Sequence, residues 1–185
     1  MSYDFLMTIR KTILLLLAAF STHAGATQLL IEPYLSYTIS AKYSEPNKTP
    51  TASGMTYGGR LGGDYQGFQF GVDYMTGSWT DDQNPQDTIT PSNFGIFLGF
   101  KFPAAPVRIY GDYFFNEEYK FKRSNGSDNY EGTEFRFGLG LTMLPVVNIN
   151  FEYGMGTLTT DNGTTMNQTI KVSYYGIGIS VPLEF

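Results

Sequence analysis

Five charged residues stand at polar positions within alternating apolar segments, and their types define the chemistry open to them. Two are arginines, Arg60 and Arg136, and three are acids, Asp73, Asp112 and Glu152. A guanidinium group offers several donors, so it can bridge more than one carboxylate. We expect a charge cluster that fills and crosslinks an interior. The alternative is a gate whose ion pairs exchange to admit ions or small solutes.

Catalytic chemistry has little support in the sequence. The only histidine is His23, inside a segment that we expect to be removed, and cysteine is absent. A Ser-His-acid site would therefore lack its imidazole base. Asp112 and Glu152 could form an acid/base pair, but the two arginines beside them indicate charge compensation. We predict no enzyme, no cofactor and no bound metal.

The composition argues against other functions. The formal net charge of -5 at pH 7 makes a nucleic-acid partner unfavourable. Asp81, Asp82 and Asp87 supply hard oxygen ligands that suit a divalent cation. Their spacing matches no calcium-loop motif, so we interpret them as part of a solvated acidic segment.

Residues 1–26 have the pattern of a secretory signal peptide. Arg10 and Lys11 precede a short apolar run, and small residues follow it up to Ala26. The run has about half of the roughly 20 residues that a membrane-spanning helix needs. We expect cleavage after Ala26 and a single domain over residues 27–185, with an uncleaved anchor as the alternative.

The rest of the chain must place the charges, and it alternates apolar and polar residues without helical periodicity. Eight alternating segments cover 31–43, 55–65, 68–74, 93–102, 107–116, 134–143, 147–156 and 174–185. Three connections are tight (Gln66-Gly67, 103–106 and Leu144-Pro145), and four are long and polar (44–54, 80–92, 117–132 and 159–169). Strands of about ten residues with alternately short and long connections are typical of outer-membrane barrels. We predict an all-β, eight-stranded antiparallel up-and-down transmembrane β-barrel.

The distribution of aromatic residues favours lipid, rather than water, outside this barrel. On the apolar faces they gather at two levels, as two membrane interfaces require. We expect a periplasmic girdle of Tyr65, Phe68, Phe102 and Phe185, and an outer girdle of Tyr43, Tyr57, Tyr74, Phe115, Phe135, Tyr153 and Tyr175. Tyr34, Phe97, Tyr110, Phe114 and Tyr174 point inward by parity, and many glycines on the same faces make room for them. The alternative is a soluble periplasmic ligand-binding barrel.

The last segment resembles the C-terminal sorting signal of outer-membrane barrel proteins, in which alternating apolar residues end in Phe. Its matching residues are Tyr175, Ile177, Ile179, Val181, Leu183 and Phe185. Residues 27–185 as a whole resemble the small OmpA/OmpX-like barrels. The resemblance implies recognition by the barrel-assembly machinery and an outer-membrane location in a Gram-negative bacterium. We expect a monomeric barrel with no periplasmic domain attached.

We expect function to reside in the long outer loops. In 117–132, Tyr119 and Phe121 alternate with Lys120 and Lys122, and Arg123 follows. These residues predict a hairpin that continues the fifth and sixth strands beyond the membrane. It could contact lipopolysaccharide phosphates, or pair its edge with a strand of a surface protein. We predict a non-enzymatic barrel that serves membrane integrity or adhesion. The alternative is a narrow or gated channel.

Overall fold

A computed structural model describes residues 27–44, 50–123, 126–142 and 146–185. The predicted signal peptide and the Leu144-Pro145 turn lie outside these residues. The strands are β1 (Gln28–Ser44), β2 (Thr51–Tyr65), β3 (Phe68–Asp81), β4 (Thr88–Lys101), β5 (Val107–Arg123), β6 (Gly126–Leu141), β7 (Asn148–Asp161), β8 (Thr164–Ser180) and β9 (Leu183–Glu184). Among the described residues, no helix is long and apolar enough to cross a membrane.

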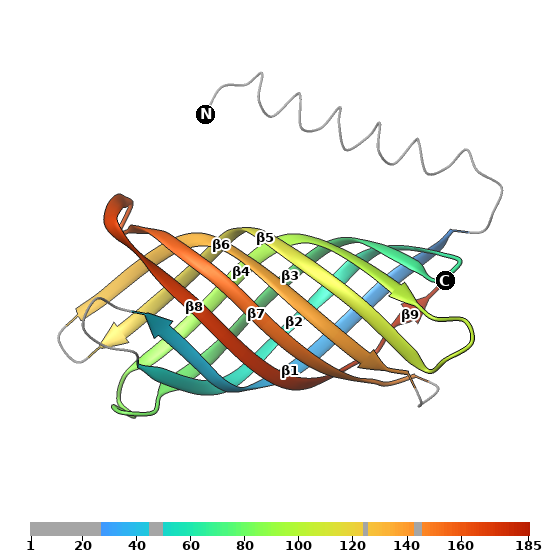
Figure 1. Ribbon diagram of the computed structural model, residues 1–185, viewed down its shortest axis with the longest axis horizontal. Helices are drawn as coiled ribbons and strands as arrows, with labels where there is room; N and C mark the ends of the chain where they lie inside the picture. Colours follow the sequence, from blue (N-terminus) through green and yellow to red (C-terminus); the bar gives the residue numbers. More distant parts are fainter. Residues whose placement is uncertain (1–26, 45–49, 124–125, 143–145) are drawn as a thin grey trace, which may run out of the picture.

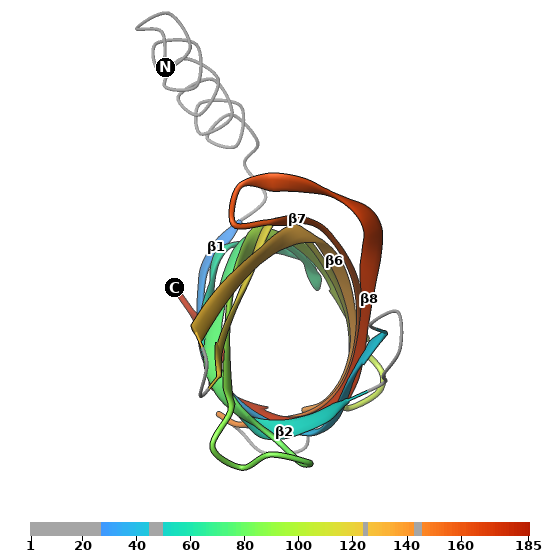
Figure 2. The ribbon, with the colours of Figure 1, turned by 90° about the vertical axis from the view of Figure 1, so that its left-hand side faces the viewer.

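The strands form one closed antiparallel barrel (Figures 1 and 2). Each strand from β1 to β8 pairs with the next, and β1 also pairs with β8, which closes the ring. The short β9 continues the path of β8 after Pro182 and pairs with β1, with Ile31 opposite Leu183. Proline lacks the amide donor that a ladder needs, which accounts for the interruption. The predicted eight-stranded all-β barrel is confirmed.

A two-residue turn sets the register between β2 and β3. Gln66 and Gly67 both have positive φ, at 52° and 90°. Two left-handed residues suit a tight hairpin, whose twist matches that of its strands. Arg60 consequently lies opposite Asp73, the pairing that the turn predicts.

The barrel presents an apolar surface outward. Leu98 on β4 is 65% exposed and Phe137 on β6 is 53% exposed, although both are large and apolar. Burial alternates with exposure along most of β1, β6 and β7, so the apolar residues turn toward the surroundings. Both predicted girdles are exposed, with the exception of Tyr43.

A β-bulge in β1 explains the exception. The pairing of β1 with β2 shifts register between Thr38 and Ala41. An extra residue there inverts the facing of all later side chains. Tyr43 is fully buried inside the barrel, and Lys42 is exposed outside it. The assignment of Tyr43 to the outer girdle was therefore wrong.

Strands replace most of the expected long loops. The β5–β6 ladder runs from Val107 opposite Leu141 to Arg123 opposite Gly126. Strands β7 and β8 are joined through Asn162 and Gly163, which both have positive φ. The hairpin that continues β5 and β6 was predicted, whereas the polar residues of 159–169 misled the sequence interpretation. Beyond the apolar band the outward faces meet water and are themselves polar. These hairpins lie at the end of the barrel opposite the C-terminus (Figure 1).

Candidate functional site

The five charged residues singled out from the sequence lie together inside the barrel. We call Arg60, Asp73, Asp112, Arg136 and Glu152 the central charge cluster. They come from β2, β3, β5, β6 and β7, so the cluster ties together more than half of the barrel wall. Glu152 is 7% exposed and the other four are at most 2% exposed.

Arg60 contacts more than one acid in this cluster. Its Nε lies 3.1 Å from Asp73 Oδ2 and 3.3 Å from Asp112 Oδ1. Its Nη2 lies 3.9 Å from Glu152 Oε1. The guanidinium also sits over the ring of Tyr110, 4.1 Å from the centroid. Arg60 is therefore held by charge and by a ring face, which a cation favours.

Arg136 completes the cluster from the opposite wall. Its Nε donates to Asp112 Oδ2 at 3.0 Å, and its Nη2 donates to Asp73. The Tyr34 hydroxyl donates to Asp73 Oδ1 at 2.8 Å and accepts from Arg136 at 3.3 Å. Both acids thus lie between two guanidinium groups, the arrangement that makes a buried carboxylate tolerable.

A second ion pair, which the sequence interpretation missed, lies nearer the end of the barrel that holds the C-terminus. Arg108 donates to both oxygens of Glu32, at 2.7 Å and 2.6 Å, in a bidentate pair. Arg60 Nη1 lies 3.5 Å from the same carboxylate and links this pair to the central charge cluster. Glu32 and Arg108 both stand at polar positions of alternating segments, so the parity of these positions could have identified them as interior residues.

Glycines clear the space that the large interior side chains occupy. A Cβ atom on Gly138 would overlap the ring of Tyr110, its cross-strand neighbour. Because Gly138 leaves room for this ring, the Tyr110 hydroxyl can donate to Glu152 Oε1 at 2.7 Å. The small residue on one strand thus positions a hydrogen-bond donor for an acid on another.

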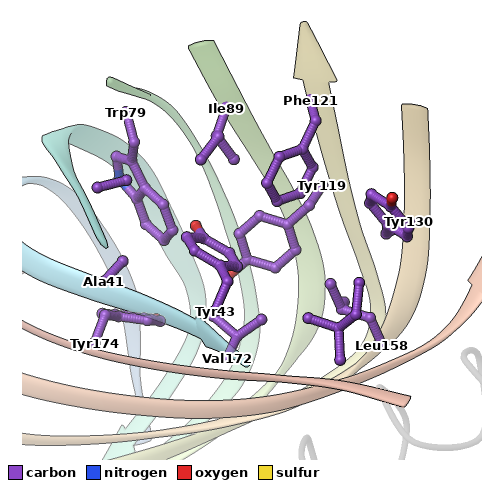
Figure 3. Close-up of a cluster of buried hydrophobic side chains, with 12 residues drawn as sticks. Ala41, Tyr43, Trp79, Ile89, Tyr119, Phe121, Tyr130, Leu158, Val172 and Tyr174 are labelled. Carbon is purple, nitrogen blue, oxygen red and sulfur yellow. The ribbon is translucent and has the colours of Figure 1, made fainter. Parts of the chain in front are cut away.

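Apolar side chains fill the outer part of the barrel (Figure 3). We call this group the outer aromatic cluster. Its buried members are Ala41, Tyr43, Ala52, Trp79, Ile89, Tyr119, Phe121, Tyr130, Leu158, Ile170, Val172 and Tyr174. The ring centroids of Tyr43 and Phe121 are 5.3 Å apart, and those of Trp79 and Tyr174 are 5.4 Å apart. Such tilted and edge-on contacts are the geometries that aromatic rings prefer.

Two residues of the predicted surface contact belong to this cluster instead. Tyr119 is fully buried and Phe121 is 4% exposed, so both were wrongly placed at the surface. A register shift between Phe114 and Glu117 turns them inward. Lys120 and Lys122 are exposed, and Arg123 lies 3.6 Å from Asp128.

The edge of this hairpin is largely covered. Strand β4 pairs with β5 as far as Lys122, and β7 pairs with β6 as far as Tyr130. Within the described residues of this hairpin, only the start of β6 remains for pairing with another strand. The expected edge-pairing surface is therefore small.

Glu134 connects the aromatic layer to the charged layer. It accepts hydrogen bonds from Tyr119 at 2.9 Å, from Asn93 at 3.1 Å, and from Tyr174. Met75 forms a second buried apolar group with Tyr34 and Phe114. Its Sδ accepts a contact from Arg136 Nη1 at 3.1 Å. The interior is thus continuous from one layer to the next.

The acidic segment at the outer end is organised as a turn. Asp81 Oδ1 accepts from the amides of Gln83, at 2.7 Å, and Asn84, at 3.2 Å. Asp82 accepts from the Ser53 hydroxyl at 3.1 Å. Within the described part of the chain, no three acidic or histidine side chains are grouped in a way that suits a metal ion.

The residues of the predicted assembly signal share one outward face of β8 and its continuation. Tyr175, Ile177 and Ile179 are 41–49% exposed, Leu183 is 38% exposed and Phe185 is 71% exposed. Val181 is partly exposed. The Phe185 amide and carbonyl pair with Leu29 at 3.0 Å and 2.9 Å, so the terminal residue belongs to the ladder.

Comparisons with known proteins agree with this geometry. The family model of the outer membrane protein beta-barrel domain matches residues 12–182. Ail of Yersinia pestis, solved with the heparin analogue sucrose octasulfate, has a TM-score of 0.58 at 12% identity, over 84% of this chain and 99% of Ail. Neisserial surface protein A has a TM-score of 0.56 at 15% identity, over 83% of this chain and 96% of its own.

A third solved structure extends the likeness. The N-terminal β-barrel domain of Pseudomonas aeruginosa OprF has a TM-score of 0.53 at 11% identity, over 85% of this chain and 100% of that domain. At these identities the likeness concerns the fold. Comparison with the curated proteins finds no match.

Proposed function

Since this chain belongs to the outer membrane protein β-barrel domain family, we propose that it is a non-enzymatic anchor in the outer membrane. Its filled barrel holds extended hairpins at the cell surface, where they serve membrane integrity or surface interaction. The assembly machinery that receives outer-membrane barrels would recognise the last strand.

The observation that carries this proposal is the continuous filling of the interior. Arg108, Arg60 and Arg136 are 1%, 2% and 0% exposed, and Trp79 beyond them is 0% exposed. An eight-stranded barrel has an interior just wide enough for side chains. Charged and aromatic layers placed in series leave a solute no continuous path, which favours an anchoring role over transport.

The same filling supports the absence of catalysis. The described residues contain no histidine, and each acid of the central charge cluster lies within 4 Å of an arginine. A general base needs a free lone pair within reach of a substrate proton. Carboxylates that are buried and neutralised by arginine do not offer one.

Surface interaction draws support from the outer end of the molecule. The exposed Lys120 and Lys122 alternate outward on the β5–β6 hairpin. A rigid barrel that presents polar hairpins suits contact with lipopolysaccharide or with a partner protein. Ail, which shares the fold, is an attachment invasion locus protein.

One observation favours a gated channel as the second candidate. Arg60 lies within 4 Å of four carboxylates, those of Glu32, Asp73, Asp112 and Glu152. A cation with several partners can exchange one for another at low cost. Such an exchange is what a gate in the central charge cluster would require.

Conductance in a planar lipid bilayer separates the two candidates. We expect the refolded protein to give a silent bilayer, and folding is checked by its altered gel mobility before heating. The Arg60→Ala variant is measured in parallel. Reproducible channel steps in the unmodified protein that change in the variant would favour the gated channel over the anchoring function.

A further inference from the structure

We propose that the outward face of β1 and β8, near the outer end, binds lipid A through Lys42 and Lys171. Lipid A here means the phosphorylated, acylated glycolipid of the outer leaflet. The inference rests on the proposed outer-membrane location. It concerns a lipid-facing surface that is separate from the barrel interior and from Lys120 and Lys122 at the end of the β5–β6 hairpin.

The two lysines form a pair on neighbouring strands. Lys42 on β1 lies opposite Ser173 on β8, and Ser44 lies opposite Lys171. Both lysines are exposed on the outside of the barrel. Diagonal neighbours on one face of an antiparallel pair are about 7–8 Å apart, so both ammonium groups can reach one phosphate-bearing headgroup.

The pair exists because of the bulge in β1. Without the register shift after Thr38, residue 42 would face the interior, as the uninterrupted alternation implies. The extra residue turns Tyr43 into the outer aromatic cluster and Lys42 outward. One irregularity thus fills the interior and adds a cation to the outer surface.

Neither lysine is neutralised by the described part of the protein. Lys101 lies 3.1 Å from Glu184, and Lys120 lies 3.4 Å from Glu118. Lys42 and Lys171, by contrast, have no carboxylate of the described residues within 4.0 Å. Two neighbouring cations repel each other when no described residue supplies a counter-charge, so a bound anion between them is favourable.

A hollow in the barrel surface adjoins the pair. It has a volume of about 520 Å³, and its lining includes Lys42, Lys171, Ser173, Met155 and Phe135. Phe135, Met155, Ser173 and Lys42 are paired in this order across β6, β7, β8 and β1, so the lysines lie at one end and the apolar residues at the other. Its apolar end carries Met155 and Phe135, which are 43% and 49% exposed. This polarity matches a lipid that joins phosphate to acyl chains.

The depth of the lysines fits the same lipid. On β8 the outward positions run from Lys171 through Ser173 to Tyr175, which is 49% exposed. Tyrosines on an outer surface mark the headgroup level of a bilayer. The ammonium groups therefore lie just beyond that level, where the phosphates of an outer-leaflet lipid are found.

Native mass spectrometry of the refolded full chain tests the site. The protein is placed in detergent micelles with lipid A, and the lipid retained per barrel is counted. We expect K42Q/K171Q to lower the affinity for lipid A roughly tenfold or more, since both cations that face the anionic headgroup are removed. Lys101→Gln, at the other end of the barrel, should leave retention unchanged.

Three results would overturn the proposal. One is equal retention of lipid A by K42Q/K171Q. Another is an equal or larger loss in K120Q/K122Q, which would move the site to the hairpin. The third is equally strong retention of phosphatidylglycerol or of inorganic phosphate, which would reduce the contact to simple charge attraction. Unaltered gel mobility before and after heating would instead refute the membrane barrel itself, so the two failures are distinguishable.

Discussion

At the level of single residues, the interior depends on arginines that each serve several acids. Arg136 is fully buried and contacts Asp73, Asp112 and Tyr34. Water cannot replace these contacts in an enclosed interior, so the loss of one arginine leaves more than one carboxylate short of charge.

Arg136→Ala should therefore destabilise the barrel strongly. Removing one partner of a buried ion pair costs about 3–5 kcal/mol, because it leaves an uncompensated charge. The urea midpoint of unfolding in lipid vesicles would measure the loss. The matched control is Lys101→Ala, whose ion pair with Glu184 is partly exposed and should contribute about 0–1 kcal/mol. Equal midpoints for Arg136→Ala and the unmodified protein would show that the central charge cluster is not a structural crosslink.

Alternation predicted which residues face the interior, but it predicted a specific ion pair only where the pairing is local. Arg60 and Asp73 face each other across a two-residue turn, so counting along the chain was sufficient. Glu32 and Arg108 meet across the interior from β1 and β5. That contact depends on the curvature and diameter of the closed barrel, which the alternation of residues does not encode.

At the level of elements, β1 and β5 change their facing at the outer end. Register shifts after Thr38 in β1 and after Phe114 in β5 turn the later apolar residues inward. β1 and β5 thus each meet two surroundings. Their apolar residues face outward within the lipid-facing apolar band, and they face the barrel interior at the outer end.

This change of facing was hidden in the sequence. A bulge adds one residue without any fixed residue type, so the alternation of β1 reads as uninterrupted from Ile31 to Tyr43. The continuation of β5 and β6 as a hairpin was predicted, but the register shift that turns Tyr119 and Phe121 inward was not. The alternation therefore located the strands within the apolar band, and it misjudged their ends.

Trp79 allows a test of whether apolar side chains at the outer end of β3 face the barrel interior. It is the only tryptophan, it is fully buried, and its ring lies 5.6 Å from that of Tyr119. We expect blue-shifted emission that neither acrylamide nor brominated lipids quench strongly. A control with Trp79→Phe and Phe137→Trp, which places the indole on the lipid face, should be quenched by brominated lipids. Strong lipid quenching of Trp79 itself would contradict the inward placement.

At the level of the whole molecule, the fold was readable because its signals agree. The count of alternating segments is even, their faces are consistent over most of the chain, and Gln66-Gly67 marks a tight turn. The lengths of the outer connections were not readable, because polar composition does not distinguish a loop from a strand surrounded by water.

The orientation of the whole barrel can be tested with single cysteines, since the chain contains none. Asn84 lies between β3 and β4, and Ala104 lies between β4 and β5 at the other end; both are exposed. We expect a membrane-impermeant maleimide added to intact cells to label Asn84→Cys and to spare Ala104→Cys. Lysed cells should label both. Labelling of Ala104→Cys alone in intact cells would reverse the orientation.

The seam between the first and last strands governs how quickly the barrel can form. Every other pairing joins strands that follow each other along the chain, so those hairpins need only short-range encounters. The seam must bring Leu30 to Glu184, and contacts between residues this distant in sequence form slowly. Until then β1 and β8 are both unpaired edges of an open sheet, and such edges readily pair with another chain. Closure of the seam is thus the step at which folding competes with aggregation.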